Sequence, residues 1–170
     1  MDLGRWFVNK ILQSAQTMQG RVRRQFRVSG EKDNFEFTVF LEDVERLSTQ
    51  LNSMTIQYQL KQELGKDKFE SLLNLITKRI TYLPESLKII EKDNQNNQAL
   101  LRSETPVKNE KVIEYFELLV TPKVHMKLKR NRNLNNETNS ISFVIGFDLL
   151  ERLINDLSEI IVEVGLKPGK

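Results

Sequence analysis

Cysteine is absent from this chain of 170 residues, and histidine occurs only once. Without thiols the chain can form neither disulfide bonds nor thiolate metal sites, and it has no cysteine nucleophile. This composition suits a reducing compartment, so we predict a cytoplasmic protein. The single histidine, His125, lies in a basic stretch, where an exposed polar role is more common than that of a base or metal ligand. We therefore expect a protein that is not an enzyme and that uses no cofactor.

Long apolar runs and glycine-rich phosphate motifs are also missing. No segment approaches the roughly 20 consecutive apolar residues of a membrane span. Arg5, Asn9 and Lys10 interrupt the apolar part of the amino terminus, unlike the core of a signal peptide. The seven glycines form neither a P-loop nor a dinucleotide-binding fingerprint. These absences predict a soluble chain without a transmembrane segment and without a nucleotide site.

The length is that of one ordinary domain, and we predict a single domain over residues 1–170. An N-terminal helix over residues 1–19 is expected to precede two halves, residues 20–83 and 84–170. Apolar residues at helical spacing predict this helix and three more. The further helices are expected to start at Glu42, to lie between Gly65 and Pro84, and to run from Asp148 to Gly165.

Alternation of apolar and polar side chains with a period of two predicts strands. Residues 112–120 are predicted to form a buried strand because they are rich in aromatic and β-branched residues, and residues 86–103 to form two short strands joined by a polar loop. The strands expected from alternation are residues 21–28, 34–41, 123–130 and 141–147. They form two hairpins, the first with its turn at residues 29–33 and the second with a polar loop through Asn139. Residues 54–60 also alternate, but the Gln, Lys and Glu residues that follow favour continuation of the helix from Glu42. The pattern predicts an α+β fold, with a mainly antiparallel sheet and amphipathic helices packed on one face.

An internal duplication is suggested by two stretches that align without gaps, residues 35–51 and residues 141–157. Phe37 aligns with Phe143, and the sequence Glu-Arg-Leu occurs in both stretches. Each stretch follows a basic strand, so the repeated unit would be strand-strand-helix. Two such units could form one sheet with a pseudo-twofold axis, or dimerise through the free face. The alternative explanation is a chance match, because any strand followed by an amphipathic helix gives such apolar coincidences.

The positive charge is concentrated in two segments. Residues 1–30 carry six basic side chains against one acidic side chain, and residues 121–133 carry five against none, although the net charge of the chain is only +3. Strand alternation places most of these cations opposite the core, where they can form one basic sheet surface, and Arg24 breaks the alternation. The predicted nucleic-acid-binding residues are Arg21, Arg23, Arg24, Arg27, Lys123, Lys127, Lys129, Arg130 and Arg132.

A basic strand surface suits a phosphate backbone, because Lys and Arg side chains release counterions when they bind it. An acidic protein or an anionic lipid would fit as well. The simpler interpretation is that charged residues occupy the wet side of a half-buried sheet and discourage aggregation at its edges. Zinc-finger spacing and a helix-turn-helix pair are both missing, and Phe40 and Tyr115 are the only candidates for stacking on bases.

The N-terminal helix carries two large aromatic residues, Trp6 and Phe7, beside Arg5 and Lys10. We predict that Trp6 and Phe7 are partner-binding residues or pack against the domain itself. Contact with a membrane surface is the alternative, because aromatic and basic residues combine in interfacial helices.

Residues 121–161 resemble the COMM-type interaction module in the order of their features. These are Thr121-Pro122, a strand, a loop, a strand ending at Phe147-Asp148, and a leucine-rich helix. The resemblance implies a protein-interaction role, but residues 20–41 depart from it because COMM proteins have helices there. In architecture, strand-rich halves that end in helices are similar to the PUR and Whirly groups of single-strand-binding proteins, although no motif of theirs is matched.

These observations favour a non-enzymatic binding or assembly protein, with nucleic acid or another anionic partner bound by the two basic strands. The alternative is a structural or adaptor subunit whose helices contact a protein partner or a second copy of the chain.

Overall fold

The computed structural model describes residues 2–18, 25–93 and 97–166, which contain three helices and ten strands. The helices are α1 (Leu3–Thr17), α2 (Lys66–Arg79) and α3 (Phe147–Leu166). The strands are β1 (Phe26–Lys32), β2 (Phe35–Val44), β3 (Ser48–Tyr58), β4 (Leu87–Asp93), β5 (Gln98–Ser103), β6 (Val107–Asn109), β7 (Val112–Val120), β8 (His125–Leu134), β9 (Glu137–Ile141) and β10 (Phe143–Gly146). The predicted α+β class and antiparallel sheet are confirmed.

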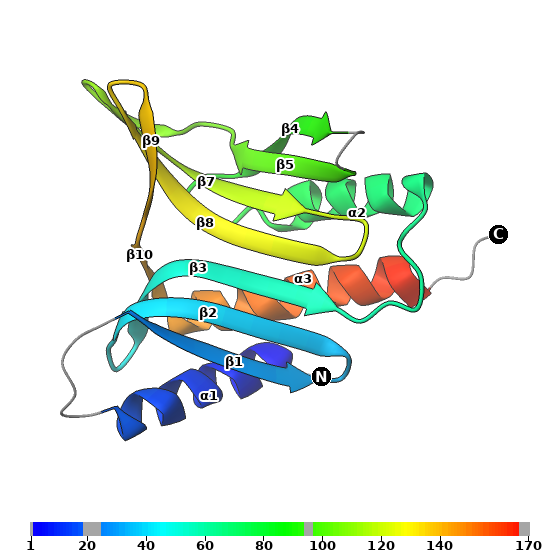
Figure 1. The fold of residues 1–170 in the computed structure, drawn as a ribbon, viewed down its shortest axis with the longest axis horizontal. Coiled ribbons are helices and arrows are strands. Elements are labelled where there is room, and N and C mark those ends of the chain that lie inside the picture. Colours follow the sequence, from blue (N-terminus) through cyan, green and yellow to red (C-terminus); the bar gives the residue numbers. More distant parts are fainter. Residues whose placement is uncertain (1, 19–24, 94–96, 167–170) are drawn as a thin grey trace.

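The strands form one antiparallel sheet in the order β1-β2-β3-β8-β7-β5-β4. Each half of the sheet follows a helix, α1 before β1 to β3 and α2 before β4 to β8, and the halves meet where β3 pairs with β8. At one end of this junction, β9 pairs with β8 while β10 pairs with β3. The chain segment from β9 to β10 therefore enters between the two central strands (Figure 1).

The three helices lie side by side on one side of the sheet, with α3 between α1 and α2 (Figure 1). Their apolar faces and the inward residues of the strands form one cluster of buried side chains. Leu72, Leu73 and Ile76 of α2 are buried in it, as are Leu150, Leu153 and Ile154 of α3. None of the described helices covers the other face of the sheet, which is therefore open.

The predicted helix from Glu42 is wrong, because residues 48–58 form β3 and β2 continues to Val44. A bulge explains the misleading spacing, since Phe40 pairs with Ser53 but Leu41 pairs with Leu51, which leaves Asn52 without a partner in the register. Leu51 and Met54 therefore both face the core although they are three residues apart. The prediction of helix for residues 54–60 fails with it, because their alternation is that of a strand.

The predicted duplication is wrong as a repeat of structure. Residues 35–51 form β2, a turn and the start of β3, whereas residues 141–157 form the end of β9, β10 and the first half of α3. Leu47, which aligns with buried Leu153, is 75% exposed in the turn between β2 and β3. The apolar residues of the two stretches therefore match in sequence but belong to different structural elements.

The first predicted hairpin forms, with a shorter turn than expected. The second is wrong in its partner strand, because β8 forms a hairpin with β9, whereas residues 143–146 of the predicted strand form β10 and pair with β3. Asp33 and Asn34 connect β1 to β2, and Asn135 and Asn136 connect β8 to β9. All four residues have positive φ, at 56°, 68°, 51° and 69°. Two consecutive residues of this kind match the type I′ turn, whose twist fits that of the paired strands and which Asn and Asp tolerate.

Candidate functional site

The open face of the sheet is formed by every second residue of β1, β2, β3 and β8. Its central residues are Arg27 and Ser29 of β1, Glu36, Thr38 and Phe40 of β2, Ser53, Thr55 and Gln57 of β3, and His125, Lys127 and Lys129 of β8. The residues between them, such as Val39, Ile56 and Met126, point into the core. Alternation therefore builds a surface of short polar side chains flanked by cations.

Two exposed cations stand on either side of this surface. Arg27 lies in the edge strand β1, where its guanidinium donates to the hydroxyl of Thr38 at 3.4 Å. Lys127 in β8 pairs with Thr55 in the strand register and forms no ion pair within the described residues. Three strand spacings of about 4.8 Å place the two strands roughly 14 Å apart. The strip between them is formed by the outward side chains of β2 and β3.

Lys129, also on the open face, is neutralised by a carboxylate. Glu117 of β7 receives the Lys129 ammonium at 3.0 Å and the Arg102 guanidinium at 3.0 Å, and only 11% of its side chain is exposed. Burial raises the pKa of Glu117, but the hydrogen bonds and charges of Lys129 and Arg102 outweigh it and hold the pKa below its usual value. In this triad Glu117 neutralises both Lys129 and Arg102, which leaves Lys127 as the cation more available to a ligand.

The Glu117 triad predicts a loss of stability in acid. A carboxyl group whose pKa is lower in the folded than in the unfolded protein stabilises the fold above the unfolded pKa, and this contribution disappears as the pH falls through the folded value. At neutral pH we expect Glu117→Gln to lower the free energy of unfolding by about 1–3 kcal/mol. The difference from wild type should shrink below about pH 4.3. Urea unfolding of both proteins across pH 2.5–7 measures it, with exposed Glu110→Gln as the control. A difference that is constant with pH would contradict the assignment.

Arg130 and Arg132, two of the predicted nucleic-acid-binding residues, lie on the helix side of the sheet. They share the parity of Met126 and Leu128 along β8, so they point away from the open face. The guanidinium of Arg130 donates two hydrogen bonds to Glu85, both at 3.0 Å, and only 12% of the Arg130 side chain is exposed. Arg130 is therefore a structural residue, which corrects its predicted role.

Arg132 is half-exposed and pairs with Glu114 at 2.6 Å. Lys123 is exposed in the turn between β7 and β8, close to the open face in sequence but outside its strands. The predicted residues Arg21, Arg23 and Arg24 lie outside the described residues. The structure therefore brings together Arg27, Lys127 and Lys129 out of the predicted set.

Trp6 and Phe7, the predicted partner-binding residues, both pack against the core, but only Phe7 is buried within it. Phe7 is fully buried, with its ring 5.3 Å from that of Phe37. Trp6 is half-buried, and the ammonium groups of Lys10 and Lys32 lie 5.9 and 5.5 Å from the centre of its ring. The apolar face of α1 packs on the sheet, so Phe7 has no surface to offer a partner. This corrects the prediction for Phe7.

A depression of about 230 Å³ lies at the centre of the open face. Its lining residues are Arg27, Glu36, Thr38, Phe40, Thr55, Gln57 and His125. Short Thr side chains between longer neighbours leave this space. Thr55 and Gln57 were not predicted as site residues, because helical spacing placed both in a helix. The alternation of residues 54–58 was the signal that identifies them.

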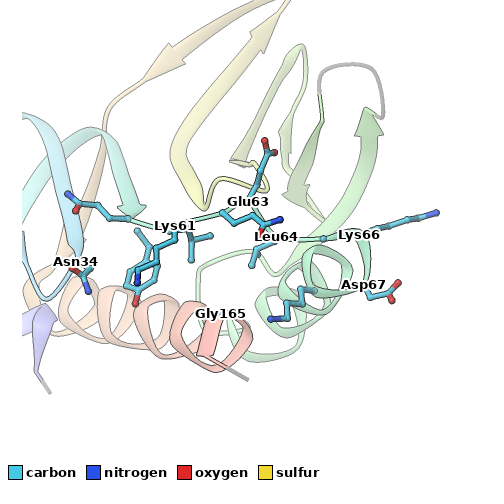
Figure 2. A pocket seen from close by; sticks show the side chains of 13 residues that line it. Asn34, Lys61, Glu63, Leu64, Lys66, Asp67 and Gly165 are labelled. Atoms are coloured by element: carbon cyan, nitrogen blue, oxygen red, sulfur yellow. The ribbon is translucent and has the colours of Figure 1, made fainter. Parts of the chain in front are cut away.

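A larger hollow of about 880 Å³ lies where the chain passes from β3 to α2, against the end of α3 (Figure 2). Its wall is mostly the exposed segment from Gln59 to Lys68. Opposite charges alternate along this wall, as Lys61, Glu63, Lys66 and Asp67 show in Figure 2. The hollow has no field of one sign to attract an ion, so it is the weaker candidate.

The described part of the chain contains neither a cluster of metal-binding side chains nor a helix that could span a membrane. No group of three or more His, Asp or Glu side chains there could hold a metal ion. None of the described helices is long and apolar enough to cross a membrane. Comparisons of the chain with protein-family models, curated proteins and solved structures found no match. Function is therefore inferred from the surface itself.

Proposed function

We propose that the open face of the sheet binds nucleic acid, with Arg27 and Lys127 as its main contacts to phosphate. One observation carries the proposal: a sheet face without a covering helix presents short polar side chains between two exposed cations. Short side chains on exposed strands let a nucleic-acid backbone approach closely, and each neutralised phosphate releases counterions. The alternative explanation is that these polar and charged side chains bind no ligand and form only the solvent-exposed side of a half-buried sheet.

The number of free cations limits how strong this binding can be. Lys129 and Arg102 are occupied by Glu117, and Glu36 adds a negative charge at the border of the surface. With Arg27, Lys127 and nearby Lys123 as contacts, we expect two to three neutralised phosphates. For a single strand, the logarithm of the binding constant should then fall with the logarithm of the salt concentration with a slope of about −2.

Fluorescence anisotropy with labelled oligonucleotides across a salt series tests the proposal. We expect Arg27→Glu combined with Lys127→Glu to weaken binding at least tenfold at low salt and to flatten the salt dependence, because two phosphate contacts become repulsive. Arg5→Glu with Lys66→Glu is the matched control, since it changes the net charge equally but on the helices. Binding that both double variants weaken alike would contradict the proposed surface.

Complete absence of binding at low salt would favour a protein partner instead. Leu47 and Val144, 75% and 71% exposed, would then be the first residues to test. They lie on neighbouring segments, because Val144 is in β10 and the backbone oxygen of Leu47 accepts a hydrogen bond from Phe147, the residue that follows β10.

A further inference from the structure

We propose that the depression on the open face receives one unstacked nucleobase, so that the chain selects single-stranded over duplex nucleic acid. This inference rests on the proposed function, because it specifies which form of nucleic acid the same surface binds.

The strand register fixes the shape of the depression. Thr38 pairs with Thr55, and these two short side chains form the floor. One step along β2, Phe40 pairs with Arg27 and makes the wall at one end. One step in the other direction, Glu36 pairs with Gln57, which in turn pairs with His125. The space of about 230 Å³ between these ends is of the size of a small planar group rather than of a duplex.

Phe40 supplies the apolar wall that a base needs. It is 37% exposed, and it is the only aromatic residue among the exposed large apolar side chains of the described chain. The other aromatic residue of this face, Tyr115, is covered by the Arg102 guanidinium, 5.0 Å from the centre of its ring. An exposed ring on a sheet offers a π face to any base, and such stacking favours single strands because their bases are not already stacked in a duplex.

The polar end of the depression offers hydrogen-bond donors and acceptors to the edge of a base. The Gln57 amide both donates and accepts hydrogen bonds, the Thr55 hydroxyl does the same, and the Glu36 carboxylate accepts them. Because donors and acceptors are both present, no base is excluded, and we expect little sequence preference. Arg27 at one end of the depression and Lys127 beside its floor can hold the phosphates on either side of the inserted nucleotide.

Substitutions at Phe40 separate stacking from charge. Phe40→Leu keeps an apolar side chain but removes the π face, whereas Phe40→Trp retains the π face. Anisotropy is measured with three labelled 15-mers: a single strand of mixed sequence, the matching duplex, and an abasic deoxyribose-phosphate strand. Thermal unfolding of each variant confirms that the fold is kept, as expected for an exposed position.

The wild type should bind the single strand more tightly than the duplex or the abasic strand. Phe40→Leu should lower single-strand affinity by roughly 5- to 150-fold, to the level of the abasic strand, with an unchanged salt slope. Phe40→Trp should bind like the wild type. Equal binding of all three ligands, with no effect of Phe40→Leu, would overturn the base site and leave the proposed function standing. Failure of every ligand to bind at low salt would overturn both.

Discussion

Replacement of Arg130 by methionine is expected to lower the free energy of unfolding by about 3–5 kcal/mol, the cost of leaving a buried charge without its partner. The carboxylate left behind is that of Glu85, which is 7% exposed and accepts both of its hydrogen bonds from Arg130. The Arg130 guanidinium also lies 4.6 Å from the centre of the Phe116 ring, so the substitution removes a cation–π contact. Urea unfolding followed by circular dichroism measures the loss.

Two further variants separate this ion pair from its surroundings. Arg132→Met, at a side chain that is 50% exposed and paired with Glu114, should cost less than about 1 kcal/mol. Glu85→Met combined with Arg130→Met should recover much of the stability lost by Arg130→Met alone, because no buried charge is then unpaired. A loss of less than 1 kcal/mol for Arg130→Met would show that Glu85 finds water or another donor.

Gly4→Ala is expected to destabilise the protein by about 3 kcal/mol or more, at the upper end of the costs of overpacking. A Cβ atom on Gly4 would lie 2.1 Å from the backbone oxygen of Glu151, so α1 and α3 would have to move apart. The Gly4 N–H also donates to the side-chain oxygen of Asn155 at 2.7 Å, and the Asn155 amide donates to Asp2 at 2.9 Å. Separation of the helices would break these hydrogen bonds as well.

Gly65→Ala is the matched control for Gly4→Ala. Gly65 precedes α2, and a Cβ atom there would meet nothing within 4 Å. Alanine is a poorer residue than glycine before a helix, typically by somewhat less than about 1 kcal/mol. Unfolding by urea should therefore separate the two variants clearly. A Gly4→Ala protein as stable as the wild type would show that α1 and α3 can adjust without cost.

The sequence was sufficient for elements whose apolar period is uninterrupted. The regular stripes of α1, α2 and α3, the alternation of β2, and the aromatic and β-branched residues of β7 predicted these elements and hence the fold class. The β3 strand was lost because the bulge at Asn52 turns a two-residue period into a three-residue step that looks helical. A bulge depends on pairing with a distant strand, so local periodicity cannot reveal it.

The same difference between local periodicity and long-range pairing explains which residues of the candidate site could be predicted. Alternation within single strands correctly placed Arg27, Lys127 and Lys129 opposite the core. The parity of Arg130 with Leu128 already indicated an inward side chain, but only the tertiary position of Glu85 shows why a buried guanidinium is tolerated. The depression depends on β2 and β3 lying between β1 and β8, an order that is set by long-range pairing and not by local sequence.

The junction of β3 with β8 has a consequence for how the chain folds. Most strand contacts within each half join neighbours in sequence, as in β1 with β2 or β7 with β8, and such contacts close short loops. The β3–β8 pairing instead joins residues about 70 positions apart, such as Thr55 and Lys127. Loop closure over that distance costs more entropy and slows folding. We therefore expect the two halves to form early, and their union with the insertion of the β9–β10 segment to be the late, rate-limiting events.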